Sequence, residues 1–186
     1  MTDDQRRDAD SRMRRALDAL ERDLAAIRTG RASTALVERI PVEYYGTQTP
    51  LNQLASISVP EAHSILIQPW DRSALGAIEK AILKSDVGLT PNVDGTVVRL
   101  NIPPLTEERR RDLVKLVHKR MEEARVEIRN HRREMADEVR RAERDGEIGT
   151  DESRRELEQV QRLTDRWVDE VDRVGKHKEQ EILEVG

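Results

Sequence analysis

Apolar residues recur at helical spacing over the first part of the chain. The residues that follow one another at alternating spacings of four and three are Met13, Leu17, Leu20, Leu24 and Ile27. Such a heptad-like seam faces a partner helix at a shallow angle. We therefore predict one helix over residues 1–29, ended by Thr29 with Gly30 as its C-terminal cap.

The helical periodicity returns after residue 105. Thr106 followed by Glu107 and Glu108 is typical of a helix N-terminus, where a hydroxyl caps and acids suit the dipole. The expected apolar stripe is Leu113, Val117, Met121, Ala124, Ile128, His131, Met135 and Val139, in a helix that runs to about Arg144. After a break over residues 145–149, Thr150 or Asp151 caps a third helix. Its expected stripe is Leu157, Val160, Leu163, Trp167, Val171, Val174 and Ile182.

Residues 30–105 have a different pattern. All seven prolines of the chain fall in this segment. Short apolar or alternating runs predict strands over residues 40–45, 54–59, 64–68 and 97–102. Ser73 is a suitable cap for a helix over residues 74–84. The concentration of turn residues indicates a separate, loop-rich α+β module.

These patterns predict an α+β fold built from two domains. Residues 1–29 and 106–186 form a long three-helix bundle, because none of the amphipathic helices can bury its stripe alone. Residues 30–105 form a small β/α/β domain inserted into that bundle. The chain enters the insert at Thr29-Gly30 and leaves it at Pro103-Pro104, and two adjacent connections favour a hinge. A rigid connection is the alternative, since prolines also stiffen a chain.

Composition excludes several classes of protein. Charged residues make up 38% of the chain and aromatic residues 2%, with a net charge of −4. The chain has no Cys, which excludes disulfides, thiolate metal sites and cysteine nucleophiles. No apolar run of about 18 residues is present, and the acidic N-terminus is unlike a signal peptide. We expect a cytoplasmic protein with no membrane partner.

A search for catalytic motifs finds none. Glycine-rich phosphate loops, nucleophile elbows and His-Glu-x-x-His zinc motifs are absent from the sequence. His118 with Glu122, and His131 with Glu127 or Glu134, have the spacing of helical metal pairs, but such pairs arise by chance in a Glu-rich chain. We therefore expect no enzyme, no catalytic residue, no metal and no cofactor, and we interpret His131 as a residue lining the bundle.

The charges of the second long helix separate by face. With Ala124 as origin and about 100° per residue, the residues between about 80° and 180° include Arg125, Arg129, Arg132, Arg133 and Arg140. Those between about 220° and 320° are Glu123, Glu127, Glu134, Asp137 and Glu138, with Glu122 the acidic exception on the arginine flank. Salt bridging is one interpretation. The other is a ridge for a polyanion, since guanidinium forks suit phosphates. In that case the net charge is small because a positive surface and a negative surface of the molecule nearly cancel.

The sequence resembles the bacterial ribosome recycling factors over nearly its whole length. The segments that carry the resemblance are residues 27–32 (IRTGRA), 42–46 (VEYYG), 50–51 (PL), 85–89 (SDVGL), 103–110 (PPLTEERR), 129–133 (RNHRR) and 178–182 (KEQEI). Their order and spacing together make the resemblance specific. His131 stands where the family is usually aliphatic and Glu134 where it usually has Asp, and neither difference removes an arginine.

The resemblance implies an L-shaped molecule with a flexible hinge at Thr29, Gly30, Pro103 and Pro104. It also implies a translation factor that binds between the ribosomal subunits after termination. With elongation factor G, and with GTP hydrolysis by that partner, such a factor splits the subunits and is not itself an enzyme. The residues implied to contact large-subunit ribosomal RNA are Arg28, Arg31, Arg129, Arg132 and Arg133, and the angular row adds Arg125.

Two other classes stay open at this stage. A helical ribosome-binding or scaffold protein that does not split subunits would share the bundle but need no elongation factor G. An RNA-processing enzyme would need a catalytic constellation, which the sequence lacks. In all these interpretations we expect the chain to act as a monomer.

Overall fold

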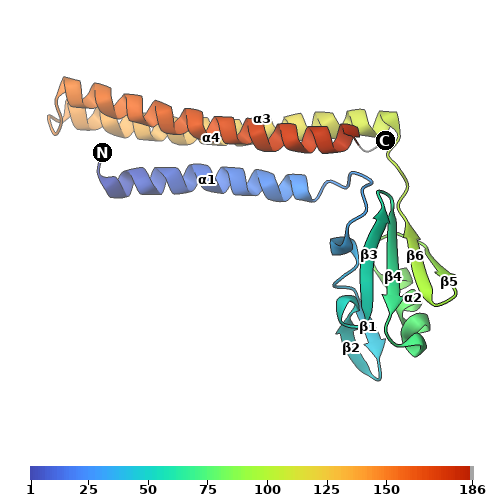
Figure 1. The fold of residues 1–186 in the computed structure, drawn as a ribbon. Helices are drawn as coiled ribbons and strands as arrows, with labels where there is room; N and C mark the ends of the chain where they lie inside the picture. Colours follow the sequence, from blue (N-terminus) through green and yellow to red (C-terminus); the bar gives the residue numbers. More distant parts are fainter. Residues whose placement is uncertain (185–186) are drawn as a thin grey trace. The chain divides into compact units, whose positions relative to one another are not determined.

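The computed structural model describes residues 1–184, and residues 185–186 lie outside the described part. The chain divides into two compact units, one made of residues 1–28 with 107–184 and the other of residues 29–106 (Figure 1). The predicted α+β class is confirmed, because one unit is helical and the other contains the sheets.

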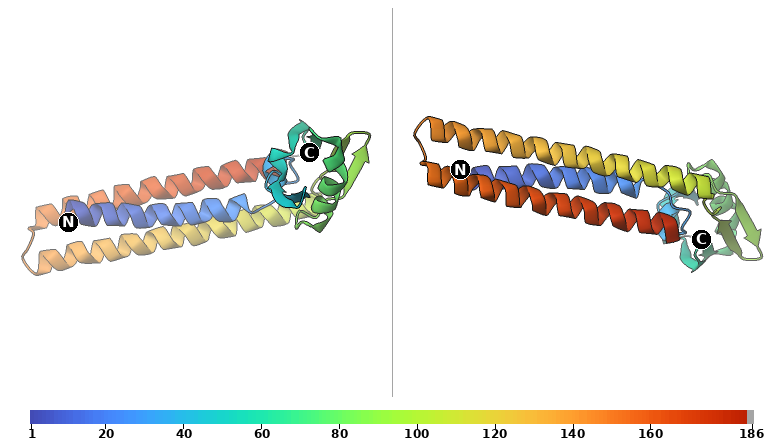
Figure 2. Two further views of the ribbon diagram at one scale, coloured as in Figure 1. Left: turned by 90° about the horizontal axis from the view of Figure 1, so that it is seen from below. Right: turned by 90° about the horizontal axis from the view of Figure 1, so that it is seen from above.

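The helical unit consists of three long helices: α1 (Asp3–Ala25), α3 (Glu107–Arg144) and α4 (Thr150–Glu184). Helices α3 and α4 form an antiparallel pair, and α1 lies along both of them (Figure 2). Each helix buries one apolar stripe, which on α1 includes Met13, Leu17, Leu20 and Leu24. The three stripes together give an aliphatic core that no single helix could form.

The first helix is shorter than the sequence predicts. It ends at Ala25, and the amide of Ala26 closes the last turn by donating to the carbonyls of Arg22 and Leu24. The amide of Ile27 donates to the carbonyl of Leu24 at 3.1 Å, a bond to the third preceding residue that makes the turn tighter than in an α-helix. Gly30 therefore lies beyond the helix and is not its cap, so the prediction of a helix through Thr29 was wrong.

The buried stripe of α4 also differs from the prediction. Leu157, Leu163 and Val174 are only half-buried. Small or polar residues that a hydropathy pattern passes over are buried instead: Ser153, Glu156, Thr164 and Gly175. Thr164 satisfies its hydroxyl by donating to the carbonyl of Val160 at 2.8 Å. The seam is thus set by which side chains fit between the helices, and hydropathy alone does not decide it.

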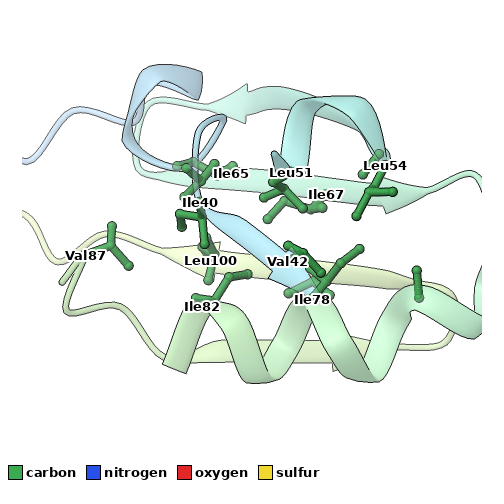
Figure 3. Close-up of a cluster of buried hydrophobic side chains, with 14 of the residues drawn as sticks. Ile40, Val42, Leu51, Leu54, Ile65, Ile67, Ile78, Ile82, Val87 and Leu100 are labelled. Atoms are coloured by element: carbon green, nitrogen blue, oxygen red, sulfur yellow. The ribbon is translucent and has the colours of Figure 1, made fainter. Parts of the chain in front are cut away.

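The second unit is built on a four-stranded antiparallel sheet in the order β3-β4-β6-β5. Its strands are β3 (Ala55–Glu61), β4 (Ser64–Pro69), β5 (Pro91–Asp94) and β6 (Val97–Asn101). Helix α2 (Leu75–Lys84) packs Ile78 and Ile82 into a cluster with Ile65, Ile67 and Leu100 of the central strands (Figure 3). Alternation along β4 and β6 therefore places their inward residues under the helix.

Two strands of this unit, β2 (Thr47–Pro50) and β5, were not predicted. Strand β2 pairs with β1 (Pro41–Tyr44), and β5 pairs with β6. The sequences Thr-Gln-Thr-Pro and Pro-Asn-Val-Asp lack apolar alternation, and their partners determine their conformation. Tyr45 and Gly46 both have positive φ, 49° and 77°, as a two-residue hairpin turn requires.

The start of α2 also needs a correction. Ser73 does not cap the helix, because its hydroxyl donates to Asp71 Oδ1 at 2.7 Å. Asp71 is the capping residue of a short 3-10 turn, Arg72–Ala74, which leads directly into α2, and it accepts from the amide of Ser73 at 2.9 Å. A carboxylate two residues earlier thus performs the role expected of the hydroxyl.

None of the helices in the described part of the chain combines the length and the apolarity that crossing a bilayer requires.

Candidate nucleic-acid interface

The two charged flanks of α3 line two different grooves of the bundle. The arginine flank faces α4, where Arg132, Arg133 and Arg140 line a groove together with Leu157 and Gln161. We call this the α3/α4 groove; its remaining lining residues are Ala136, Asp137 and Val160.

The acidic flank of α3 faces α1. Glu134 and Glu138 line a depression there with Asp8 and Arg12. Arg12 lies 3.6 Å from Glu134 and partly neutralises that flank. The separation of charge by face, seen in the sequence, therefore corresponds to two separate interhelical grooves, with Asp137 as the exception, because it lines the α3/α4 groove beside Arg140.

The N-terminal half of the arginine row is paired within the bundle. Arg125 Nε donates to Asp172 Oδ1 of α4 at 3.1 Å, and its Nη1 donates to Glu122 at 3.2 Å. Partial burial works against the charge of Arg125, but these hydrogen bonds raise its pKa above the usual value. Arg129 lies 3.6 Å from Glu122. The structure thus connects Arg125 to α4 by an ion pair, a contact that the angular row could not reveal.

The C-terminal half of the row is different. Arg132 is half-buried and Arg133 is exposed. Arg133 donates to the amide oxygen of Asn130 at 3.3 Å. Within residues 1–184 neither arginine forms an ion pair, whereas Arg140 lies 3.4 Å from the exposed Asp137. Of the five arginines of the row, Arg132 and Arg133 are therefore the two whose charge no described carboxylate neutralises.

The other two predicted RNA-binding residues lie outside α3. Arg28 and Arg31 are exposed in the irregular segment that follows α1. In the part of the chain that the structure describes, Arg31 forms no ion pair.

His131 is not a core residue, contrary to its placement on the apolar stripe. Its side chain is 20% exposed, and its ring nitrogens lie 3.9 Å from Glu127 and 3.5 Å from Glu134. The polar ring turns toward the acidic flank at the margin of the bundle. No group of three or more potential ligand side chains is placed to hold a metal ion among the described residues.

The two connections of the inserted unit lie side by side. Gly30 has φ +75°, and a Cβ added to it would lie 3.3 Å from the carbonyl oxygen of Pro103. His63 links both connections, because its Nδ1 lies 2.7 Å from the Gly30 carbonyl and its own carbonyl accepts from the amide of Ile102 at 2.8 Å. Thr29 is buried and Pro104 is exposed. Glycine is required at position 30 both by its backbone angle and by this close approach.

Sequence reasoning missed the α4 side of the α3/α4 groove. Leu157 and Gln161 line it from α4. A helical wheel of one helix shows which residues share a face, but it cannot show which face of a second helix lies opposite. The spacing of residues 157, 160 and 161 was the available signal, since it places all three on one side of α4.

Comparison with known proteins gives consistent matches. The family model described as ribosome recycling factor matches residues 20–183. The ribosome-recycling factor of Shouchella clausii is 56% identical over 185 residues, covering 100% of both chains. That of Halalkalibacterium halodurans is 56% identical over 178 residues and 96% of each chain.

Two solved structures are also similar over their whole length. A solution structure of the ribosome recycling factor matches with a TM-score of 0.72 and 49% identity, covering 98% of this chain and 97% of the other. The second match comes from models for the T. thermophilus ribosome recycling factor and the E. coli elongation factor G bound to the E. coli post-termination complex. It has a TM-score of 0.61 and 44% identity, covering 100% of both chains.

Proposed function

The chain belongs to the ribosome recycling factor family, and we propose that it acts with elongation factor G on the post-termination ribosome. In this proposal it binds between the subunits, and GTP hydrolysis by elongation factor G drives their separation and the release of mRNA. The match to a recycling factor bound with elongation factor G to the post-termination complex supports the choice of partner.

The α3 arginines make the main contact with large-subunit ribosomal RNA in this proposal. The single observation that carries it is the absence of an ion pair for Arg132 and Arg133 within residues 1–184, in a row whose other three arginines, Arg125, Arg129 and Arg140, are paired. An unneutralised guanidinium retains its attraction for phosphate. Arg129, Arg28 and Arg31 extend this contact. Arg125 contributes as well, while its bond to Asp172 also joins α3 to α4.

The chain itself supplies binding and the transmission of force, with no catalytic residue, metal or cofactor of its own. The nucleotide chemistry belongs to elongation factor G. We place the protein in the cytoplasm as a monomer, because that is where ribosomes are split and because an intersubunit site accommodates one slender bundle.

The hinge of the proposal consists of Thr29 and Gly30 on one connection and Pro103 and Pro104 on the other. The approach of Gly30 to Pro103, and the two contacts of His63, support a pivot in which the two connections move as one body.

A subunit-separation assay tests the function. Post-termination ribosomes are mixed with the protein alone, with elongation factor G and GTP, or with both, and light scattering follows splitting. We expect splitting only when all components are present. Binding without splitting would identify a ribosome-associated scaffold protein, and RNA cleavage without elongation factor G would identify an RNA-processing enzyme; either result contradicts the proposal.

The arginine contact has its own test. The double variant Arg132→Ala/Arg133→Ala removes two guanidiniums that form no ion pair with a described residue, so we expect about tenfold or greater loss of ribosome affinity and a weaker salt dependence. The melting temperature should change little. The matched control is Arg173→Ala, which removes an exposed arginine that is already paired with Glu170 at 2.8 Å. Equal effects of the two variants on ribosome binding would contradict the assignment.

A further inference from the structure

The α3/α4 groove has the dimensions of a site for one small molecular unit. Its volume is about 450 Å³, within the range of about 300–1,000 Å³ that ligand sites occupy. An A-form duplex presents a convex, regular backbone that rests on a surface and does not enter a hollow between two helices. The groove is therefore suited to a single group that projects out of a partner.

The walls of the groove differ in chemistry. The α3 side supplies the guanidiniums of Arg132, Arg133 and Arg140 and the carboxylate of Asp137. Asp137 lies 3.4 Å from Arg140, whereas Arg132 and Arg133 have no ion pair among the described residues. The α4 side supplies the half-buried Leu157 and the buried Val160. Inorganic phosphate would use only the cationic wall. A ligand that combines an anion with a flat, largely apolar body would use both walls.

Gln161 adds a polar group on the α4 side. Its Nε2 donates to Asp165 Oδ1 at 2.8 Å. A carboxylate can only accept, so this bond fixes which end of the amide faces Asp165. The amide oxygen is left as a hydrogen-bond acceptor for a ligand.

From this combination we infer that the α3/α4 groove binds one unpaired RNA nucleotide, with its phosphate on the arginines and its base against Leu157 and Gln161. A base inside a duplex cannot reach such a hollow, whereas a bulged or looped nucleotide can be splayed out and stacked on a guanidinium plane. The inference rests on the proposed ribosomal RNA contact and adds the structural class of RNA that the groove selects.

The test compares two RNA hairpins with the full-length protein. Their stems have the same sequence, but one is fully paired and the other carries a single bulged 2-aminopurine. We expect the bulged hairpin to bind about tenfold more tightly at low salt, with a change in 2-aminopurine fluorescence. The variant Leu157→Gln should abolish both the preference and the fluorescence change. The matched control Leu163→Gln alters a half-buried leucine of the same helix that does not line the groove, and it should retain both.

Other outcomes overturn the inference. Equal binding of the two hairpins with unchanged fluorescence would show that the groove does not take a nucleotide, and so would failure to bind either hairpin. The proposed function is judged separately, by ribosome binding of Arg132→Ala/Arg133→Ala. If that variant still loses ribosome affinity while the hairpins bind equally, the proposed contact with ribosomal RNA is supported and only the inferred nucleotide site is rejected.

Discussion

At the scale of single residues, Gly175 determines how closely α4 approaches α3. A Cβ built on it would overlap with Sδ of Met121. Replacing a mid-helix glycine by alanine gains up to about 1 kcal/mol of helix propensity. Overpacking a filled core costs about 1–3 kcal/mol. We expect the second effect to exceed the first, so Gly175→Ala should lower the free energy of unfolding by about 1 kcal/mol, measured by urea denaturation.

Two further variants isolate that steric effect. In a Met121→Ala background the obstructing side chain is gone, so Gly175→Ala should become neutral or stabilising. Gly76→Ala in α2 adds a methyl group where no atom other than the adjacent residues and the helix's own backbone lies within 4 Å, and it should be stabilising by about 0.5–1 kcal/mol. A loss of stability that persists without Met121 would show that the contact is not the cause.

The hydrogen bond between Tyr44 and Asp71 sets a second residue-scale prediction. Tyr44 donates its hydroxyl to Asp71 Oδ2 at 2.7 Å. That bond, together with partial desolvation and the nearby carboxylate charge, raises the pKa of Tyr44 to about 12. Because the folded pKa lies above the unfolded one, the stabilisation is complete below about pH 10 and is lost as the pH rises toward 12.

An ultraviolet titration measures this pKa directly. In Tyr45→Phe, Tyr44 is the only tyrosine left, and its ionisation should have a midpoint near 12. In the double variant Tyr45→Phe/Asp71→Asn the midpoint should fall, because the charged acceptor is gone. A midpoint near 10 in the first variant would contradict the hydrogen bond.

At the scale of elements, α1 is fixed to α4 by polar bonds at the edge of the apolar seam. The indole Nε1 of the buried Trp167 donates to Asp10 Oδ1 at 2.8 Å. Removing the acceptor leaves a buried donor unpaired, which costs about 1–3 kcal/mol. We expect Asp10→Ala to be destabilising by that amount in thermal unfolding followed by circular dichroism. With Trp167→Phe already present, the further Asp10→Ala change should cost much less, and equal costs in both backgrounds would rule out the bond.

A second polar contact acts closer to the start of α1. Arg6 donates to Glu156 Oε1 at 2.6 Å, and Glu156 is buried on α4. The amine of Met1 also lies 3.7 Å from Glu156 Oε1, so losing Arg6 would leave this buried carboxylate with the weaker of its two cationic contacts. This contact and the Asp10 bond both join α1 to α4, so together they help to set the register of the two helices.

At the scale of the whole molecule, the proposed mechanism needs the two units to be coupled through their connections. A Gly-Ser insertion between Arg28 and Thr29 lengthens one connection at the boundary of the units without altering the core of either. We expect ribosome binding within about twofold of the original protein, since the α3 arginines are intact. Splitting with elongation factor G and GTP should slow by several-fold, because a flexible connection transmits force poorly. Unchanged splitting rates in the light-scattering assay would count against coupling through the hinge.

Much of the architecture could be read from local pattern. Periodicity placed α3 and α4 within a residue or two, because long amphipathic helices carry a repeated signal. The same reasoning misplaced the end of α1, which ends at Ala25, two residues before the last seam residue, Ile27. It also missed β2 and β5, whose extended conformation depends on pairing with β1 and β6. Short strands have little signal of their own, and their partners decide them.

The sequence by itself determined which residues share a face of each helix, and hence that the arginines and the acids of α3 lie on opposite flanks. Only the tertiary structure decided which element each flank meets. It paired Arg125 with Asp172, left Arg132 and Arg133 without an ion pair among residues 1–184, and placed Leu157 across the groove. The physical reason is that periodicity follows from the geometry of one helix, whereas pairing, burial and groove shape depend on the register between helices. That register is set by side-chain fit, such as Gly175 against Met121, which no single-helix pattern contains.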